Sequence, residues 1–379
     1  MTSPAPTQAR ISIIGAGPGG LTCARILQRN GIAVTVHDRD PGPEVRNQGG
    51  TLDLHADNGQ LALRAAGLLA EFFELSRPEG QEMRGLDLTG EIRYHHVPEA
   101  GDLFKPEIDR GQLRDLLLRS VEPGTVRWGH ALERVAGPAD GPRRLHFADG
   151  TTATADLVIG ADGAYSPVRR AISAAVPEYS GVSVLEAWFF DSGNRHPELA
   201  ELVGQGSAVA ADGERGMFAQ RNSGDHIRVY LIQQVPVDWI GRNDLRPEDT
   251  EGIRSVLLRE YARWSPALLR VITENDGPYV DRPIFALPVP HTWDHNPTVT
   301  LLGDAAHLMP PLGVGVNLAM LDASDLALAL VDGATVEDAI RTYEKTMLPR
   351  SIEMATALEG GAAELLSADG YPGDPDGES

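Results

Sequence analysis

Three short motifs place glycine and aspartate directly after apolar runs of the chain. They are Gly15, Gly17 and Gly20 after residues 10–14, Asp162-Gly163 after residues 157–161, and Gly303-Asp304 after residues 298–302. Glycine lets a ligand approach the backbone closely because it has no Cβ atom, and the start of a following helix offers free N–H groups to an anion. Aspartate can accept hydrogen bonds from sugar hydroxyls. Together these residues predict a site for a large phosphorylated cofactor.

The first motif has the spacing G-x-G-x-x-G between a strand and a helix. In such a turn Gly15 permits the tight bend, Gly17 lets a pyrophosphate reach the backbone, and Gly20 lets helix and strand pack closely. The next strand ends at Asp38, where a carboxylate can hold a ribose hydroxyl and favours FAD or NAD over NADP. We therefore predict a dinucleotide site here, and we count Arg39, which follows Asp38, among its residues.

The other two motifs have a simpler interpretation when each is taken alone. The Asp-Gly motif could be an ordinary turn before a capped helix, and the Gly-Asp motif could be an ordinary strand-turn-helix connection. The sequence after the Gly-Asp motif favours the cofactor interpretation, because a glycine-rich loop leads into an apolar helical pattern from residue 318. The expected cofactor residues in that loop are Gly313, Gly315 and Asn317.

In this order, the three motifs resemble those of the class A flavoprotein monooxygenases, the p-hydroxybenzoate hydroxylase-like family, over residues 11–348. The resemblance implies an α/β fold: a Rossmann-like FAD-binding domain with an inserted β-sheet substrate domain and a long C-terminal helix. It implies that Gly15, Gly17, Gly20 and Asp38 hold the ADP part of FAD. The Asp-Gly motif would lie near the pyrophosphate and serve NADPH use, and the Gly-Asp motif would hold the ribitol chain.

The chemistry that the family implies is an oxygen transfer. NADPH reduces FAD and leaves, and the reduced flavin reacts with O2 to give a C4a-hydroperoxide. This species delivers one oxygen atom to an electron-rich ring or enol. Because the flavin carries the difficult chemistry, the protein has to position the substrate and exclude water.

A narrower resemblance points to the tetracycline-inactivating, TetX-type branch of the family. It is carried by residues 49–68, 105–118 and 303–311. The branch implies that Arg46 meets NADPH and that Asp53 and Arg110 contact FAD. An alternative for Arg110 is a solvated charge in the first turn of a helix capped by Asp109.

The sequence also departs from this branch. The loop after Pro311 is one residue shorter than the usual P-F-A-G-x-G-x-N. Glu186 stands where the branch has Gln, Gly206 or a neighbour where it has Arg, and Arg228 where it has His. A site built to hydrogen-bond its ligand rejects one that it cannot pair with, so flavin chemistry carries over better than substrate identity. We expect a pocket lined by Glu186, Arg228, Tyr230, Gln233, Met217 and Phe218, although each could instead be a surface or core residue of a sheet.

Composition limits the class of protein. The chain of 379 residues can bury a large core, and its net charge of −21 argues against nucleic acid or an anionic membrane as a partner. It has no apolar run long enough for a membrane span and no signal-peptide pattern, so we expect a cytoplasmic location. The acidic chain offers no obvious apolar stripe for a dimer, so we expect a monomer. The single cysteine, Cys23, is expected to be a buried small hydrophobe, which excludes disulfides and redox-active cysteine pairs. No metal site is expected.

Domain boundaries follow the motifs. We expect an FAD-binding domain over 1–75, 101–175 and 279–334, a substrate-binding domain over 76–100 and 176–278, a C-terminal helix over 335–366 and a disordered tail over 367–379. Within them the patterns predict helices over 56–66, 109–121 and 250–273, a hairpin around Thr89-Gly90, and a run of strands over 181–235.

Three functions from different classes fit these observations. The first is an NADPH-dependent flavin monooxygenase that acts on an aromatic or polyketide substrate, tetracyclines included. The second is a flavin-dependent reductase or oxidase, which would transfer no oxygen atom. The third is a binding protein that sequesters a drug or pigment and holds FAD mainly for structure.

Overall fold

A parallel five-stranded sheet forms the centre of the cofactor half of the chain. The computed structural model describes residues 3–44, 49–358 and 366. The strand order is β17 (Val299–Leu301), β11 (Leu157–Gly160), β1 (Ile11–Ile14), β2 (Val34–His37) and β7 (Val126–Arg127). Because all neighbours are parallel, every strand ends at the same edge. The expected α/β, Rossmann-like architecture is confirmed.

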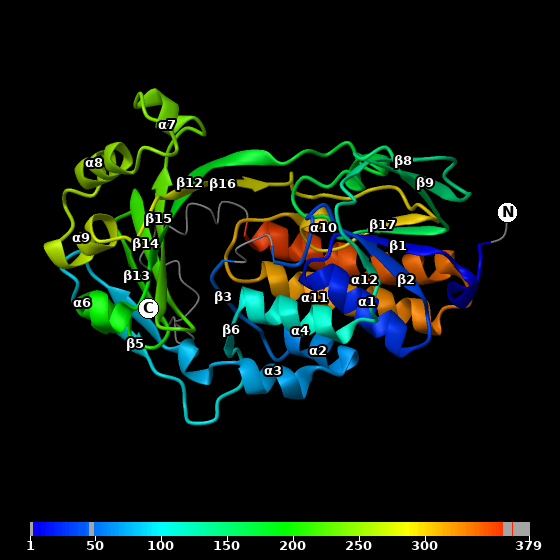
Figure 1. Cartoon of the computed structure of the whole chain (residues 1–379), viewed down its shortest axis with the longest axis horizontal. Coiled ribbons are helices and arrows are strands. Elements are labelled where there is room, and N and C mark those ends of the chain that lie inside the picture. The colour runs from blue at the N-terminus through cyan, green and yellow to red at the C-terminus, as the bar shows by residue number, and fades with distance from the viewer. Residues whose placement is uncertain (1–2, 45–48, 359–365, 367–379) are drawn as a thin grey trace.

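Helices cover one face of this sheet and a small antiparallel sheet covers the other (Figure 1). The helices are α1 (Pro18–Arg29), α2 (Gly59–Ala66), α3 (Leu69–Leu75), α4 (Arg110–Ser120), α10 (Asp304–His307), α11 (Gly315–Asp332) and α12 (Val336–Ala357). The antiparallel strands are β8 (Leu132–Ala136), β9 (Arg143–Phe147) and β10 (Thr152–Ala155). This half also contains the short 3-10 helices η1 (Pro6–Gln8), η2 (Pro78–Gln81) and η3 (Arg169–Ala171). A two-stranded antiparallel ribbon pairs β3 (Thr51–Asp53) with β6 (Glu107–Asp109).

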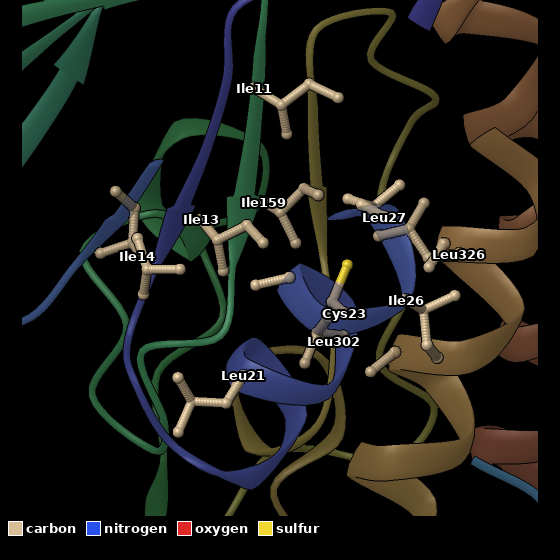
Figure 2. Close-up of a cluster of buried hydrophobic side chains, with 14 of the residues drawn as sticks. Ile11, Ile13, Ile14, Leu21, Cys23, Ile26, Leu27, Ile159, Leu302 and Leu326 are labelled. Carbon is tan, nitrogen blue, oxygen red and sulfur yellow. The ribbon is translucent and has the colours of Figure 1, made fainter. Parts of the chain in front are cut away.

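The core between the sheet and α1 is apolar. Figure 2 shows Cys23 among buried aliphatic side chains, with Ile13 and Ile159 from the sheet and Leu326 from α11 close by. Burial raises the pKa of the Cys23 thiol to about 12, so it stays protonated at neutral pH. The prediction of a buried, inert cysteine is therefore confirmed.

A mixed seven-stranded sheet forms the other half. Its order is β16 (Val280–Ala286), β12 (Glu178–Phe189), β15 (His226–Gln234), β14 (Arg215–Asn222), β13 (Ser207–Ala211), β4 (Met83–Leu86) and β5 (Ile92–His96). Helices pack on one face of it: α5 (Ser192–Arg195), α6 (Pro197–Val203), α7 (Trp239–Arg242), α8 (Thr250–Glu260) and α9 (Pro266–Thr273). The hairpin around Thr89-Gly90 joins this sheet, as predicted, through β4.

Several expected elements have different bounds. Residues 250–273 form two helices because Ser265 caps a new helix that begins at Pro266. The run of strands over 181–235 is interrupted by α5 and α6, where Pro197 begins the second of them. Strand β16 pairs with β12, so residues 280–286 belong to the seven-stranded sheet and not to the expected FAD-binding segment 279–334.

The long C-terminal helix is present and ends at Ala357, and the expected tail over 367–379 lies outside the described residues. No helix within the described ranges combines the length and the apolar character that crossing a membrane requires.

Candidate functional site

The glycines of the turn after β1 differ in the space around them. A Cβ atom on Gly15, whose φ is +108°, would lie 2.2 Å from the carbonyl oxygen of Ala161, and one on Gly20 would lie 2.0 Å from that of Gly15. A Cβ on Gly17 would meet nothing within 4 Å. Gly15 and Gly20 are therefore required for packing, whereas Gly17 leaves open space at the N-terminus of α1. This is the arrangement that lets a phosphate reach the backbone.

The three motifs come together at one edge of the parallel sheet. Ile14 is in register with Gly160, and Gly160 with Leu301, so the residues that follow these strands are neighbours. Gly15, Asp162 and Gly303 accordingly begin three adjacent turns. Ligands of open α/β sheets bind at this edge, outside the carboxyl ends of the strands.

Asp38 follows β2 at the same edge and holds the glycine-rich loop. Its Oδ2 accepts a 2.7 Å hydrogen bond from the N–H of Ala16, and its Oδ1 accepts one of 2.8 Å from the N–H of Asp40. A carboxylate oxygen can accept more than one hydrogen bond, so Asp38 retains capacity for a ribose hydroxyl. Arg39 is exposed, and Arg46 lies outside the described residues.

Asp162 carries an unsatisfied acceptor. Its Oδ2 accepts a 3.2 Å hydrogen bond from the N–H of Val168, but its buried Oδ1 has no hydrogen-bond partner. Burial raises the pKa of this carboxyl to about 6. An unsatisfied buried acceptor is costly unless a donor reaches it, so the site fits a ligand or a water that donates a hydrogen bond at the end of β11.

The turn with Gly303 and Asp304 is held by buried hydrogen bonds, and the side chain of Asp304 is exposed. The N–H of Gly303, whose φ is +58°, donates to Oδ2 of Asp322 at 3.1 Å, and Nε2 of His307 lies 2.5 Å from the same oxygen. His307 therefore braces the turn. The side chain of Asp304 is exposed and makes no hydrogen bond or ion pair within the described ranges, so this carboxylate is available to a ligand.

Arg110, the first residue of α4, is exposed and lies near Asp304. Burial is the main cause that lowers the pKa of its guanidinium. Tyr230 and Asp304 raise this pKa, and Arg228 lowers it, so all three lie near Arg110. The FAD contact of Arg110 and the alternative of a solvated charge on α4 both stay predictions.

The loop before α11 is held by Asn317. Its Oδ1 accepts hydrogen bonds from the N–H groups of His55 (2.9 Å) and Gly59 (3.2 Å), and its Nδ2 donates to the carbonyl of Asp53 at 2.9 Å. Asn317 thus positions β3 and the segment after it, and its contact with a cofactor stays a prediction. In the same loop Gly313 has φ +86° and open space around it, and Gly315 begins α11.

The two faces of the seven-stranded sheet divide the expected pocket residues. Glu186, Tyr230 and Phe218 are directly opposite one another on β12, β15 and β14, and Arg228 lies two residues from Tyr230 on the same face. This face meets the cofactor half, because a Cβ on Gly50 would lie 2.9 Å from the hydroxyl of Tyr230. Met217 and Gln233 alternate to the opposite face, where the helices pack, so their expected place in the pocket is wrong.

Glu186 forms the centre of a charged cluster on the pocket face. It pairs with Arg228, which is buried and lies over the rings of Trp188 and Tyr230. It also accepts a 2.5 Å hydrogen bond from Nε of Arg282 on β16. Burial opposes ionisation of Glu186, but Arg282 and Arg228 together lower its pKa. Arg282 escaped prediction because its strand was assigned to the other domain, although alternation along residues 280–286 could have revealed it.

An apolar wall lies beside this cluster. It consists of Val182, Val184, Ile232, Phe218, Tyr230, Ile284, Leu312 and Leu366. Leu312 comes from the shortened loop after Pro311, so this loop packs against the sheet.

Comparisons with known proteins agree with this geometry. Residues 8–357 match a family model described as FAD binding domain. The chain is 31% identical to Monooxygenase asqM of Emericella nidulans over 90% of this chain and 92% of that protein. It is 30% identical to a 3-amino-4-hydroxybenzoate 2-monooxygenase of Streptomyces cremeus over 95% and 89%. The structure is similar to tetracycline destructase Tet(55) with a TM-score of 0.72, 19% identity, and coverage of 95% and 90%. This last likeness concerns the fold alone.

Proposed function

Because this chain belongs to the FAD binding domain family and is an FAD-dependent monooxygenase, we propose that it uses NADPH and O2 to insert one oxygen atom into an aromatic or polyketide substrate. Two electrons come from NADPH, one oxygen atom enters the substrate, and the other leaves as water. Bound FAD would supply this chemistry, since it can accept a hydride and activate O2.

The observation that carries the proposal is that the turns with Gly17, Asp162 and Asp304 follow adjacent parallel strands at one edge of the sheet, with Arg110 near Asp304. The open backbone at Gly17 and the N-terminus of α1 fit the phosphates of FAD. Asp38 and Asp304 are acceptors for sugar and ribitol hydroxyls, and Arg110 offers five donors with no partner among the described residues. Gly313 and Gly315 let a flat ring approach the start of α11.

The substrate side follows from the pocket face of the seven-stranded sheet. Phe218 and Ile284, which are only partly buried, offer an apolar surface for a ring, and packing of the ring there would displace water from the reacting atoms. Tyr230 belongs to this wall and lies near Arg110, and burial raises the pKa of its hydroxyl, so it stays a hydrogen-bond donor at neutral pH. Its role would be to orient a polar group on the substrate.

The substrate class comes from two kinds of relative. A hydroxybenzoate is named for the relative from Streptomyces cremeus, and tetracycline for the structural neighbour Tet(55). The altered residue Glu186 favours small aromatic compounds over tetracycline as the first substrates to test. The monomeric state and the cytoplasmic location remain predictions of the sequence.

The test is a turnover assay with the FAD-loaded protein, NADPH and ¹⁸O2. Separate reactions would contain 3-amino-4-hydroxybenzoate, tetracycline or no aromatic compound. We expect a product that carries one ¹⁸O atom and forms only with NADPH. Flavin that cycles between reduced and oxidised forms without labelled product from any of a wider set of phenols would instead indicate a reductase or oxidase. Flavin that NADPH does not reduce would indicate a binding protein.

A further inference from the structure

A buried donor without a partner lies on the helix side of the seven-stranded sheet. It is Nε2 of Gln233, a residue that is 1% exposed and that makes no hydrogen bond through this atom among the described residues. Arg215 is directly opposite Gln233 on β14, and its buried Nε also lacks a partner in this part of the chain. A buried donor that stays unsatisfied costs free energy. Both atoms therefore indicate an acceptor that the described residues do not provide.

A cavity lies beside Gln233. It has a volume of about 130 Å³ and is bounded by the end of β15 and by the helices α7 and α8. Val235, Trp239 and Val256 give it an apolar lining, and the last two are buried. A cavity of about 150 Å³ accepts benzene in another protein, so this one has room for a single ring. Aromatic rings also pack favourably on an indole such as that of Trp239.

The charged residues that line the cavity are already paired. Nε of Arg242 donates to Asp238 at 2.7 Å, and Glu260 pairs with Arg215. An ion that entered would lose its hydration and find no uncompensated charge in return, which is costly. The cavity therefore favours an uncharged molecule.

The cavity is separate from the pocket face of the sheet. Tyr230 on β15 belongs to the pocket face, whereas Gln233, three residues later, lies on the side of Leu231, where the helices pack. Figure 1 shows α8 on the side of this sheet that faces away from the cofactor half. A molecule beside Gln233 would thus displace neither FAD nor the substrate of the proposed function.

We propose that this cavity is a second binding site, for a small uncharged molecule that carries one ring and a carbonyl oxygen. The carbonyl oxygen accepts a hydrogen bond from Nε2 of Gln233, and the ring packs on Trp239 and Val256. The ligand supplies the acceptor that the described residues lack at this place. The inference does not depend on the proposed function.

The experiment reads the cavity and the pocket face separately. The FAD-loaded protein is labelled with 5-fluorotryptophan, and the ¹⁹F signals of Trp239 and Trp188 are assigned with the variants Trp239→Phe and Trp188→Phe. The probes are acetophenone, toluene and benzoate. We expect acetophenone to shift the Trp239 signal in a saturable way, independently of Trp188, whose ring lies next to Arg228 on the pocket face. Benzoate should bind beside Trp239 more weakly, because its charge finds no partner there.

Variants of the cavity test the role of the donor. Gln233→Met removes the donor and nearly keeps the side-chain volume. It should raise the dissociation constant of acetophenone about 3- to 10-fold, the factor for one hydrogen bond between uncharged groups. Toluene has no acceptor, so its unchanged affinity in this variant would show that the cavity is intact. Gln234→Met alters the exposed next residue, which does not line the cavity, and should change neither affinity. Val256→Phe fills the cavity and should abolish the binding of both compounds.

Three results would overturn the inference. If acetophenone causes no saturable shift of the Trp239 signal, the cavity holds only water. If Gln233→Met binds acetophenone as tightly as the unaltered protein does, the buried donor is not used. If benzoate binds beside Trp239 more tightly than acetophenone, the site takes an anion. The FAD content of the protein and its bleaching by NADPH are measured separately, so none of these results bears on the proposed function.

Discussion

Asp322 on α11 accepts a 3.1 Å hydrogen bond from the backbone N–H of Gly303, at the turn after β17. The same carboxylate receives His307 and pairs with Arg350 of α12 at 2.8 Å. These groups fix the turn from the buried side, and Asp304 remains exposed at its tip. Two aspartates thus have two different tasks: Asp322 holds the backbone of the turn, and the exposed Asp304 is available to a ligand.

Asp304→Ala should weaken FAD binding and leave the fold intact. A lost hydrogen bond to a charged group costs about 1.5–3 kcal/mol, which corresponds to about a 10- to 100-fold rise in the dissociation constant. The measurement is a fluorescence titration of the apoprotein with FAD. Asp332→Ala, at the far end of α11, is the control and should bind FAD normally. Equal affinity in both variants would contradict the role of Asp304.

Gly15→Ala should lower the stability of the apoprotein, whereas Gly17→Ala should lower its affinity for FAD. At Gly15 a Cβ meets a carbonyl oxygen at 2.2 Å in a backbone with φ +108°, so the apoprotein should lose about 2–3 kcal/mol of unfolding free energy. At Gly17 a Cβ meets nothing, so the apoprotein should unfold as the unaltered one does. That Cβ would occupy the space proposed for the phosphates, and FAD affinity should fall. Denaturation of both apoproteins and FAD titration of Gly17→Ala would test the contrast; a Gly17→Ala variant with unchanged FAD affinity would refute it.

Glu107 should make stability depend on pH. Burial, and after it the charge of Asp53, raise its pKa from 4.5 to about 8. The folded protein therefore binds more protons than the unfolded chain between these pH values, so the unfolding free energy falls as pH rises through the window. The slope is at most about 1.4 kcal/mol per pH unit. Glu107→Gln keeps an acceptor for the Thr51 hydroxyl but cannot ionise, and should remove this slope. Denaturation of the apoprotein from pH 5 to 8 is the measurement, with exposed Glu99→Gln as control; an unchanged slope in Glu107→Gln would count against this account.

The residues at the carboxyl edge of the parallel sheet could be predicted because each motif there is a short stretch of sequence. Glycines at Gly15 and Gly303 and acids at Asp38 and Asp162 follow short apolar runs, and parallel strands bring such ends together whatever lies between them. The side chains on the pocket face of the seven-stranded sheet were harder to predict. Along β14 and β15 a shift of one residue moves a side chain to the other face of the sheet. No local sequence pattern indicated that Phe218 faces the pocket and Met217 faces the helices.

Arg228 and Arg282 share one carboxylate, yet their removal should have unequal effects. Arg228 is buried, so Arg228→Met leaves Glu186 with the half-exposed Arg282 as its only remaining cationic partner among the described residues, besides the indole N–H of Trp188, and should cost about 3 kcal/mol or more, as for other broken buried pairs. Arg282 is half exposed, so Arg282→Met lets water replace part of what is lost and should cost about 1 kcal/mol or less. Denaturation of both variants in the FAD-loaded form gives the comparison. If the two losses are equal, burial does not set the strength of the cluster.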